Sequence, residues 1–354
     1  MYPAVTVLET LGFNQESVLW IGSRGGMEET LVTRLEIPYQ SIPAAGIHGV
    51  GFSRLPGNFW KLLKGFFASQ KILRSYQPDV LFFTGGYVAF PMALAGIRKP
   101  SLLFVPDIEP GLALKALARF ADQIALTTES SRTYFPNSSK LTVTGYPVRP
   151  GLEKWSQEKA LDYFGFSANL PTLAVVGGSK GARSINNALL TILPELLEEM
   201  QVIHITGHLD WEVVDSNAKK LTDQQSERYQ AFPYLHEIGA AFGAANLIVS
   251  RAGASTLGEY PLFGLPAILV PYPYAWRYQQ VNAGYLVEQG AAVIIEDANL
   301  DTELLSRIKS LMTDKTALTL MSKAMASLAV PNAAQRIADL IKTISGKPDG
   351  GVAA

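Results

Sequence analysis

Residues 172–190 read TLAVVGGSKGARSINNALL, and this stretch decides the fold. The apolar run Leu173–Val176 predicts a buried strand, residues 177–183 a glycine-rich turn, and residues 184–200 a helix. Glycines in such a turn let backbone N–H groups approach an anion, and the helix that follows adds its unpaired amides and positive dipole end. An ordinary tight strand-to-helix connection remains the alternative.

Short apolar runs separated by helical patterns recur on both sides of this stretch. Continuous β-branched runs that alternate with helices are typical of parallel sheets buried on both faces. The runs fall into two series, which predict an α/β fold with two doubly wound domains. The predicted strands are Val18–Ile21, Val80–Thr84, Leu102–Val105, Ile124–Thr127 and Leu141–Thr144 in the first series, and Leu173–Val176, Val202–Thr206, Leu247–Ser250, Ala267–Val270 and Val293–Ile295 in the second.

The domain boundary is expected near Tyr146–Gly151, where two prolines and a glycine break regular structure. We therefore expect a first domain over residues 1–148 and a second over 149–331. The segment Leu152–Phe164 is expected to be helical. A C-terminal helix over 332–345 is expected to pack back towards the first domain, followed by a flexible tail over 346–354.

Composition excludes several classes of function. The 354 residues include 30 Lys and Arg against 31 Asp and Glu, so no global positive field points to nucleic acid. The chain has no cysteine, and its four histidines lack the spacing of a metal site, so no metal is expected. Residues 80–97 are uncharged, but Gly85, Gly86 and Pro91 interrupt them. We interpret them as a strand, a glycine turn and the start of a helix rather than a membrane span.

A second glycine-containing turn follows the strand Leu247–Ser250 and reads SRAGAST over residues 250–256. Glu259 lies just beyond it, where an acidic side chain at the carboxyl edge of a parallel sheet can accept hydrogen bonds from ribose hydroxyls. The alternative is that Glu259 closes a capping box with Ser255 or Thr256.

A third segment, residues 271–283, reads PYPYAWRYQQVNA. Its glutamines, asparagine and aromatic residues suit the hydroxyl and acetamido groups of a sugar. A solvated loop that leads into a helix is the alternative.

The order GGSKGAR, RAGASTLGE and PYPYAWRYQQVNA resembles the MurG family, GT-B glycosyltransferases that transfer N-acetylglucosamine from UDP-N-acetylglucosamine to a lipid-linked muramyl pentapeptide. The first half agrees, with Gly85-Gly86-Tyr87-Val88 after the second strand and Gly145-Tyr146-Pro147-Val148-Arg149 at its end. The similarity covers nearly the whole chain. It implies two Rossmann-like domains facing a cleft, an inverting reaction in peptidoglycan precursor synthesis, no cofactor, and a peripheral location on the cytoplasmic face of the cell membrane.

The resemblance also implies roles for individual residues. Arg149 and Ser179 would contact the donor diphosphate, Glu259 the ribose hydroxyls, and Gln279 the N-acetylglucosamine. Leu235 would hold the uracil through its backbone. The complete expected donor set is Arg149, Gly178, Ser179, Leu235, Ala254, Ser255, Thr256, Leu257, Gly258, Glu259 and Gln279. The expected acceptor and membrane set is Gly85, Gly86, Tyr87, Phe59, Trp60, Leu63, Phe66 and Phe67.

The chain departs from the family pattern in two places. The family opens with a strand and a glycine turn ending in histidine before a segment like Tyr2-Pro3-Ala4, and we expect a misplaced start rather than a truncated or altered relative. The family also carries a His-Glu-Gln-Asn stretch where this chain has Phe104-Val105-Pro106-Asp107, so that Asp107 replaces the asparagine, and Ile108-Glu109-Pro110-Gly111 follow it. Asp107 and Glu109 are therefore the candidate acceptor-side bases. Each could instead cap a helix that starts near Pro110.

The segment 58–76 combines a broad apolar face with Lys61, Lys64, Lys71 and Arg74. Such a helix suits either an anionic membrane surface or a protein core. The resemblance favours the membrane, because the acceptor of the family carries a polyprenyl tail. Two other functions stay open: transfer to a different lipid acceptor, motivated by Asp107, and UDP-sugar binding without catalysis. A UDP-sugar epimerase of similar architecture is disfavoured, because this chain lacks a matching acid/base set near the sugar.

Overall fold

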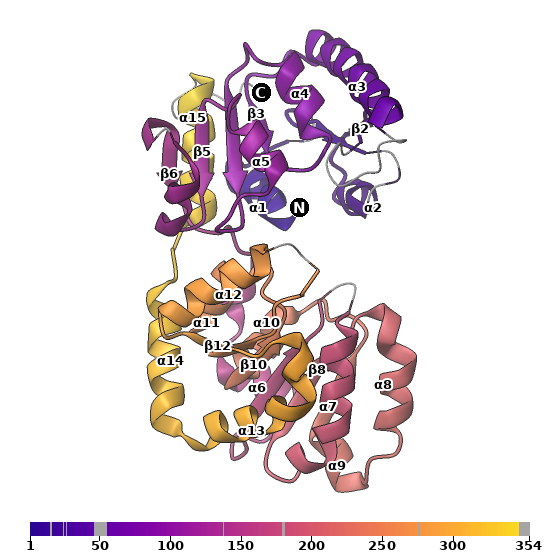
Figure 1. The fold of residues 1–354 in the computed structure, drawn as a ribbon, viewed down its shortest axis with the longest axis vertical. Coiled ribbons are helices and arrows are strands. Elements are labelled where there is room, and N and C mark those ends of the chain that lie inside the picture. The colour runs from indigo at the N-terminus through magenta and orange to yellow at the C-terminus, as the bar shows by residue number, and fades with distance from the viewer. Residues whose placement is uncertain are drawn as a thin grey trace. The chain divides into compact units, whose positions relative to one another are not determined.

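The computed structural model describes residues 1–14, 16–23, 25, 27–45, 55–136, 138–178, 181–274 and 277–346. The chain forms two compact units, which Figure 1 draws in one view. Unit 1 comprises Met1–Val148 together with Pro331–Ala354, and unit 2 comprises Arg149–Val330. Each unit has its own parallel sheet.

Unit 2 is built on a six-stranded sheet of order β12-β11-β10-β7-β8-β9, in which every pairing is parallel. The chain runs outward from β7 to β9, returns beside β7 as β10, and runs outward again to β12. The strand order thus reverses between β7 and β10, the place where doubly wound sheets bind ligands. The strands are β7 Thr172–Val176, β8 Gln201–Ile205, β9 Tyr229–Phe232, β10 Leu247–Ser250, β11 Ala267–Leu269 and β12 Ala292–Ile294.

The helices of unit 2 bury the apolar faces of its strands. Ile185 and Leu189 of α7 and Ile308 of α13 join Val202 and Val249 of the sheet in one buried cluster. α10 packs against β7 and α6. The helices are α6 Gln157–Phe164, α7 Arg183–Leu196, α8 Trp211–Ala218, α9 Asp223–Glu227, α10 Ile238–Ala244, α11 Thr256–Phe263, α12 Tyr278–Glu288, α13 Leu300–Thr313 and α14 Lys315–Ser327.

Unit 1 contains a four-stranded parallel sheet of order β3-β4-β5-β6 and a parallel pair, β1-β2. Every residue of β4 is buried, which explains the uninterrupted apolar run Leu102–Val105 after Ser101. The strands are β1 Trp20–Gly22, β2 Tyr39–Ser41, β3 Leu81–Phe83, β4 Ser101–Val105, β5 Gln123–Leu126 and β6 Leu141–Val143. The helices are α1 Tyr2–Leu11, α2 Met27–Arg34, α3 Leu55–Tyr76, α4 Ala89–Ala95, α5 Leu112–Leu117 and α15 Ala333–Ser345.

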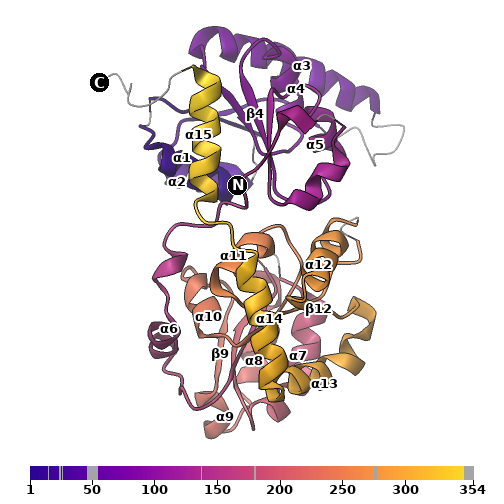
Figure 2. The ribbon, with the colours of Figure 1, turned by 90° about the vertical axis from the view of Figure 1, so that its left-hand side faces the viewer.

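The C-terminal helix α15 belongs to unit 1 although the whole of unit 2 precedes it in sequence. It lies beside α1 and β4 (Figure 2). Its fully buried Ile337 packs with Val7 of α1 and with Leu102 and Phe104 of β4. The last helical pattern of the sequence therefore completes the core of the first unit.

The sequence predicted ten of these strands, with ends that differ by at most two residues. It missed β2 and β9, whose residues include the polar side chains of Gln40 and Gln230. The prediction of one helix over Leu152–Phe164 is wrong. A 3-10 turn, η4 (Leu152–Lys154), comes first, and α6 begins only at Gln157. The Ser156 hydroxyl accepts from the Lys159 amide and so caps α6 at that point. Residues 80–97 form β3, a glycine turn and α4, as predicted. Within the described ranges, no helix is both long and apolar enough to cross a membrane.

Candidate active site

The turn after β7 lies at the point where the strand order of unit 2 reverses. Gly178 and Gly181 have φ values of 77° and 80°, in the left-handed region that favours glycine. The Gly177 amide donates to the Ile205 carbonyl at 2.8 Å, and the Gly181 amide donates to the Gly178 carbonyl at 3.0 Å. α7 begins directly afterwards with no side-chain cap, so its positive end faces the turn. Ser179 lies outside the described residues.

A second loop, after β8, packs directly against this turn. A Cβ on Gly207 would lie 2.3 Å from the Gly181 nitrogen and 2.4 Å from its Cα. Gly207 also has a φ of 80°. Only glycine allows this backbone-to-backbone approach, so the shape of the first turn depends on the second loop.

Arg149 and Glu259 meet at the same end of the unit 2 sheet. The Arg149 Nε donates to Glu259 Oε1 at 2.9 Å, and the Glu259 side chain is 5% exposed. The capping-box alternative for Glu259 is wrong, because α11 has Ser255 at its N-cap and no side-chain cap hydrogen bond. The two residues that the sequence assigned separately to diphosphate and ribose thus form one ion pair.

The turn between β10 and α11 holds the other expected diphosphate and ribose residues. The Thr256 hydroxyl donates to the Gly253 carbonyl at 2.7 Å. Tyr260, one turn into α11, shares a 2.7 Å hydrogen bond with the Ser250 hydroxyl at the end of β10. Both bonds fix α11 on the sheet. Residues Ala254, Ser255, Thr256, Leu257 and Gly258 therefore lie at the carboxyl end of β10, next to the turn after β7.

Arg251 anchors this region, although no role was expected for it. Its guanidinium pairs with Asp297, donates to the Ser184 hydroxyl at 2.8 Å, and donates to the Val270 carbonyl at 3.1 Å. The ring of Tyr272 lies 5.2 Å away. One side chain thus joins the ends of β10 and β11 to the start of α7. Its position directly before the glycine turn was the only sequence signal.

Gln279 lies in the first turn of α12, after β11, and Leu235 lies in the loop after β9. Gln279 Oε1 accepts from the Tyr272 amide at 2.8 Å, which directs the amide nitrogen of Gln279 away from that loop. Leu235 is buried and follows β9. Next to it, the ring of Tyr234 stacks on His208 at 6.1 Å between centroids. The sequence had assigned no role to these two aromatic residues.

Asp107 and Glu109 follow β4 in unit 1 and are both partly buried. Glu109 pairs with Lys115 at 3.4 Å. The Thr127 hydroxyl lies 2.9 Å from the Pro106 carbonyl and holds the start of this loop. The helix-capping alternative is wrong for both carboxylates, because Gly111 is the N-cap of α5 and no side chain caps that helix.

The other acceptor-side residues lie on β3 to α4 and on α3. Gly85 and Gly86 have φ values of 108° and 85°, and Tyr87 beside them is 57% exposed. α3 packs on α4 through the stripe that includes Gly65 and Ser69. Its residues Phe59, Trp60 and Phe67 are 64%, 56% and 60% exposed, whereas Leu63 and Phe66 are half-buried. A purely core-facing α3 is therefore wrong.

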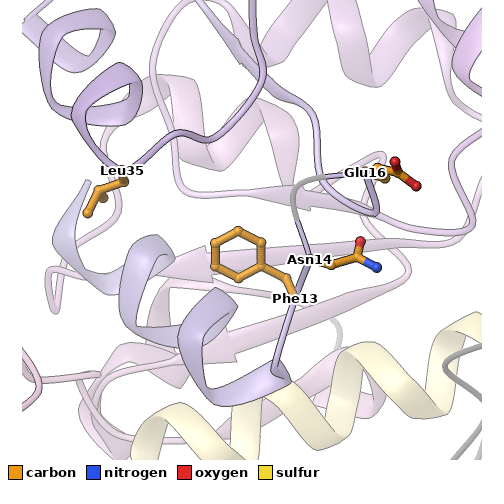
Figure 3. A pocket seen from close by; sticks show the side chains of 4 residues that line it. All are labelled: Phe13, Asn14, Glu16 and Leu35. Carbon is orange, nitrogen blue, oxygen red and sulfur yellow. The ribbon is translucent and has the colours of Figure 1, made fainter. Parts of the chain in front are cut away.

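Unit 1 also has a hollow of about 550 Å³ lined by Phe13, Asn14, Glu16 and Leu35 (Figure 3). None of the expected site residues lines it. Among the described residues, no group of three or more His, Asp or Glu side chains is placed to hold a metal ion.

Comparison with known proteins addresses the whole chain. Residues 1–126 match the Glycosyltransferase family 28 N-terminal domain, and residues 172–337 match the Glycosyltransferase family 28 C-terminal domain. A UDP-N-acetylglucosamine–N-acetylmuramyl-(pentapeptide) pyrophosphoryl-undecaprenol N-acetylglucosamine transferase of Desulforamulus reducens is 35% identical, over 97% of this chain and 94% of that protein. The chain belongs to this transferase family. A Roseiflexus member of the family is 37% identical, over 93% of this chain and 84% of that protein.

Solved structures agree with the family. The crystal structure of Acinetobacter baumannii MurG is similar with a TM-score of 0.75 and 27% identity, covering 97% of this chain and 95% of that one. The transferase family member described here therefore has the GT-B fold. A UDP complex of Staphylococcus aureus MnaA is similar at a TM-score of 0.67 but only 14% identity, over 99% of this chain and 96% of that one, and shows a shared fold alone.

Proposed function

We propose that this chain transfers N-acetylglucosamine from UDP-N-acetylglucosamine to a polyprenyl-diphosphate-linked muramyl pentapeptide, with inversion at the anomeric carbon, in peptidoglycan precursor synthesis. Family membership over nearly the full length supports both substrates. The observation that carries the proposal is the edge of unit 2 where the glycine turn, the Arg149–Glu259 pair and Gln279 all follow neighbouring strands.

The donor half of the proposal follows from the chemistry of these groups. The Glu259 carboxylate accepts hydrogen bonds from the ribose hydroxyls, and Arg149 supplies positive charge for the diphosphate. The Arg149 Nε contact uses one carboxylate oxygen, and a carboxylate can accept several donors. Gln279, with its oxygen held by the Tyr272 amide, directs its NH₂ group to the hydroxyls of the sugar. Leu235 holds the uracil through its backbone.

Departure of UDP concentrates negative charge on the diphosphate. The positive end of α7, with the dipoles of its backbone amides, and the Arg149 guanidinium are groups of this chain that stabilise this charge. Because these dipoles are fixed by the fold, they need no reorganisation during the reaction.

The acceptor half of the proposal requires a base that removes a proton from the acceptor hydroxyl as it attacks the sugar. Asp107 and Glu109 are the candidates, at the carboxyl end of β4. Neither is used as a helix cap, and Glu109 already has the Lys115 ammonium beside it. Both carboxylates stay candidates, and Asp107, which stands in place of the asparagine of the family stretch, is tested first.

A transfer assay with the purified chain tests the proposal. We expect N-acetylglucosamine from UDP-N-acetylglucosamine to appear on the lipid-linked muramyl acceptor, and not on diacylglycerol. Product on diacylglycerol alone would establish the alternative lipid acceptor. Binding of UDP-N-acetylglucosamine in calorimetry without any turnover would establish a non-catalytic binding protein instead.

The lipid anchor of the acceptor implies contact with a membrane surface, and we place the chain peripherally on the cytoplasmic face. α3 carries the features for it: exposed Phe59, Trp60 and Phe67 beside exposed lysines. We expect cosedimentation with vesicles that contain anionic lipid, and loss of it in a Phe59→Ser, Trp60→Ser double variant. Leu209→Ser on unit 2, where the leucine is 74% exposed, is the matched control. Equal binding by both variants would remove α3 from the proposal.

A further inference from the structure

His204 lies in β8 and is fully buried, and both of its ring nitrogens have hydrogen-bond partners. Its Nδ1 lies 2.8 Å from the Tyr229 hydroxyl, and its Nε2 lies 3.0 Å from Asn186 Oδ1. Asn186, also fully buried, donates from Nδ2 to the Thr206 carbonyl and to Asp210 Oδ2, each at 2.9 Å. Asp210 Oδ1 accepts from the Arg183 Nε at 2.9 Å. A line of buried side chains thus runs from Tyr229 of β9 to Asp210, which pairs with the exposed Arg183 at the start of α7.

The chemistry of Asn186 fixes the direction of every bond in this line. The Thr206 carbonyl and the Asp210 carboxylate only accept, so the NH₂ group of Asn186 must face them. Its carbonyl oxygen then faces His204, whose Nε2 must carry the proton. His204 Nδ1 is left as an acceptor, and the Tyr229 hydroxyl must donate to it.

The protonation states agree with this direction. Burial lowers the pKa of His204 to about 3, with the Asp210 carboxylate acting in the opposite sense. Burial also raises the pKa of the Tyr229 hydroxyl above its ordinary value. The imidazole is therefore neutral and the phenol protonated at neutral pH, as the line requires.

The end of this line lies against the turn that the donor diphosphate would occupy. A Cβ on Gly181 would lie 2.9 Å from the Thr206 carbonyl oxygen and 3.2 Å from Asp210 Oδ2. The same two acceptors receive the Asn186 amide. Arg183 and Asn186 both lie in the first turn of α7, directly after the glycines. The line therefore sets the distance between the turn 177–183 and the loop 206–210.

We propose that Tyr229, His204, Asn186 and Asp210 form a positioning network that holds Gly181 and the start of α7 against the loop 206–210, in the arrangement that binds the donor diphosphate. None of the four residues touches the substrate in this role. The inference rests on the proposed donor and deepens it, because it assigns diphosphate affinity to side chains beneath the turn.

Two substitutions of His204 separate positioning from general support of the fold. His204→Gln keeps an NH donor at the place of Nε2, so Asn186 keeps its partner. His204→Asn places its amide near Nδ1 and cannot reach Asn186. Affinities for UDP and for uridine, which lacks both phosphates, are measured by NMR titration of the full chain. We expect His204→Asn to lose about tenfold or more in UDP affinity, the effect of one unsatisfied buried polar group, with uridine affinity within about twofold. His204→Gln should restore most of the UDP affinity.

The other outcomes are decisive as well. Equal losses for UDP and uridine in His204→Asn, or no loss for UDP, would overturn the positioning role. If His204→Asn does not fold, Tyr229→Phe takes its place, because it removes only the hydroxyl that fixes Nδ1. A smaller loss confined to UDP supports the network, and an unchanged ratio of UDP to uridine affinity overturns it. A wild-type chain that binds neither ligand contradicts the proposed function first, and this inference falls with it.

Discussion

The carboxyl ends of the strands in unit 1 and unit 2 are organised differently. In unit 2, side chains that are at most one-quarter exposed join neighbouring segments. Asn186 and Asp210 join the start of α7 to the loop after β8. Arg251 joins the end of β10 to Ser184 of α7 and to Asp297 after β12, and Arg149 pairs with Glu259 of α11. In unit 1, Asp107 and Glu109 follow β4, Glu109 pairs with Lys115 of the neighbouring helix α5, and α3 exposes aromatic side chains. We interpret unit 2 as preorganised for a small charged donor, and unit 1 as open to a large lipid-linked acceptor.

The largest expected effect tests the chemical role of unit 1. Asp107→Asn should lower kcat by about 10²–10⁴-fold, the usual contribution of a positioned general base. UDP affinity should not change, because the donor groups lie in unit 2. Steady-state kinetics and a UDP titration measure both quantities. Asp339→Asn, an exposed carboxylate on α15, is the control. If Glu109→Gln instead lowers kcat by this amount and Asp107→Asn does not, the base is Glu109.

The backbone contact between the two loops of unit 2 gives the next effect. Gly207→Ala should cost about 3 kcal/mol of unfolding free energy or more, because about 1–2 kcal/mol of left-handed backbone strain adds to a clash with Gly181. Gly290→Ala is a matched control, since Gly290 has a φ of 72° and open space around its Cα. It should cost only the strain. Equal destabilisation in urea unfolding would mean that the two loops can separate freely.

The ion pair at the unit 2 edge gives an intermediate effect. Glu259→Ala should weaken UDP binding by about 1–3 kcal/mol, the cost of leaving buried polar partners unsatisfied. Calorimetric titration measures this, with Glu288→Ala on the exposed end of α12 as the control. Unchanged UDP affinity would assign Glu259 to the stability of the fold alone.

The smallest effect is a pH dependence of stability. Burial lowers the pKa of His204 in the folded chain to about 3. Below about pH 6.5 the imidazole is therefore protonated in the unfolded chain but stays neutral in the folded chain. The stabilisation is complete above pH 6.5 and is lost as the pH falls towards 3. Between pH 7 and pH 5 the wild type should lose about 2 kcal/mol of unfolding free energy relative to His204→Gln. If the unfolding free energies of the two proteins changed with pH by the same amount, His204 would be protonated in the folded chain.

Sequence reasoning proposed the donor-side groups but could not say how they are joined. Glycine-rich turns after apolar runs predicted the loops after β7 and β10, and both follow the expected strands. It kept capping as an alternative for Glu259 and Asp107, because a carboxylate near a helix start fits both readings. It assigned no role to His204, since a histidine inside an apolar strand carries no pattern of its own. The hydrogen bonds of His204 join α7, β8 and β9, which are far apart in sequence.

The sequence alone determined the alternation of strands and helices, the glycine turns and the family, because these depend on local patterns and on the order of motifs. The tertiary structure decided three further points. It placed β10 beside β7, so that two turns separated by about seventy residues share one edge. It paired Arg149 with Glu259 rather than leaving either alone. It also exposed Phe59, Trp60 and Phe67 on a helix whose other face is buried. Each depends on which segments pack together, and local patterns carry no information about contacts between distant parts of the chain.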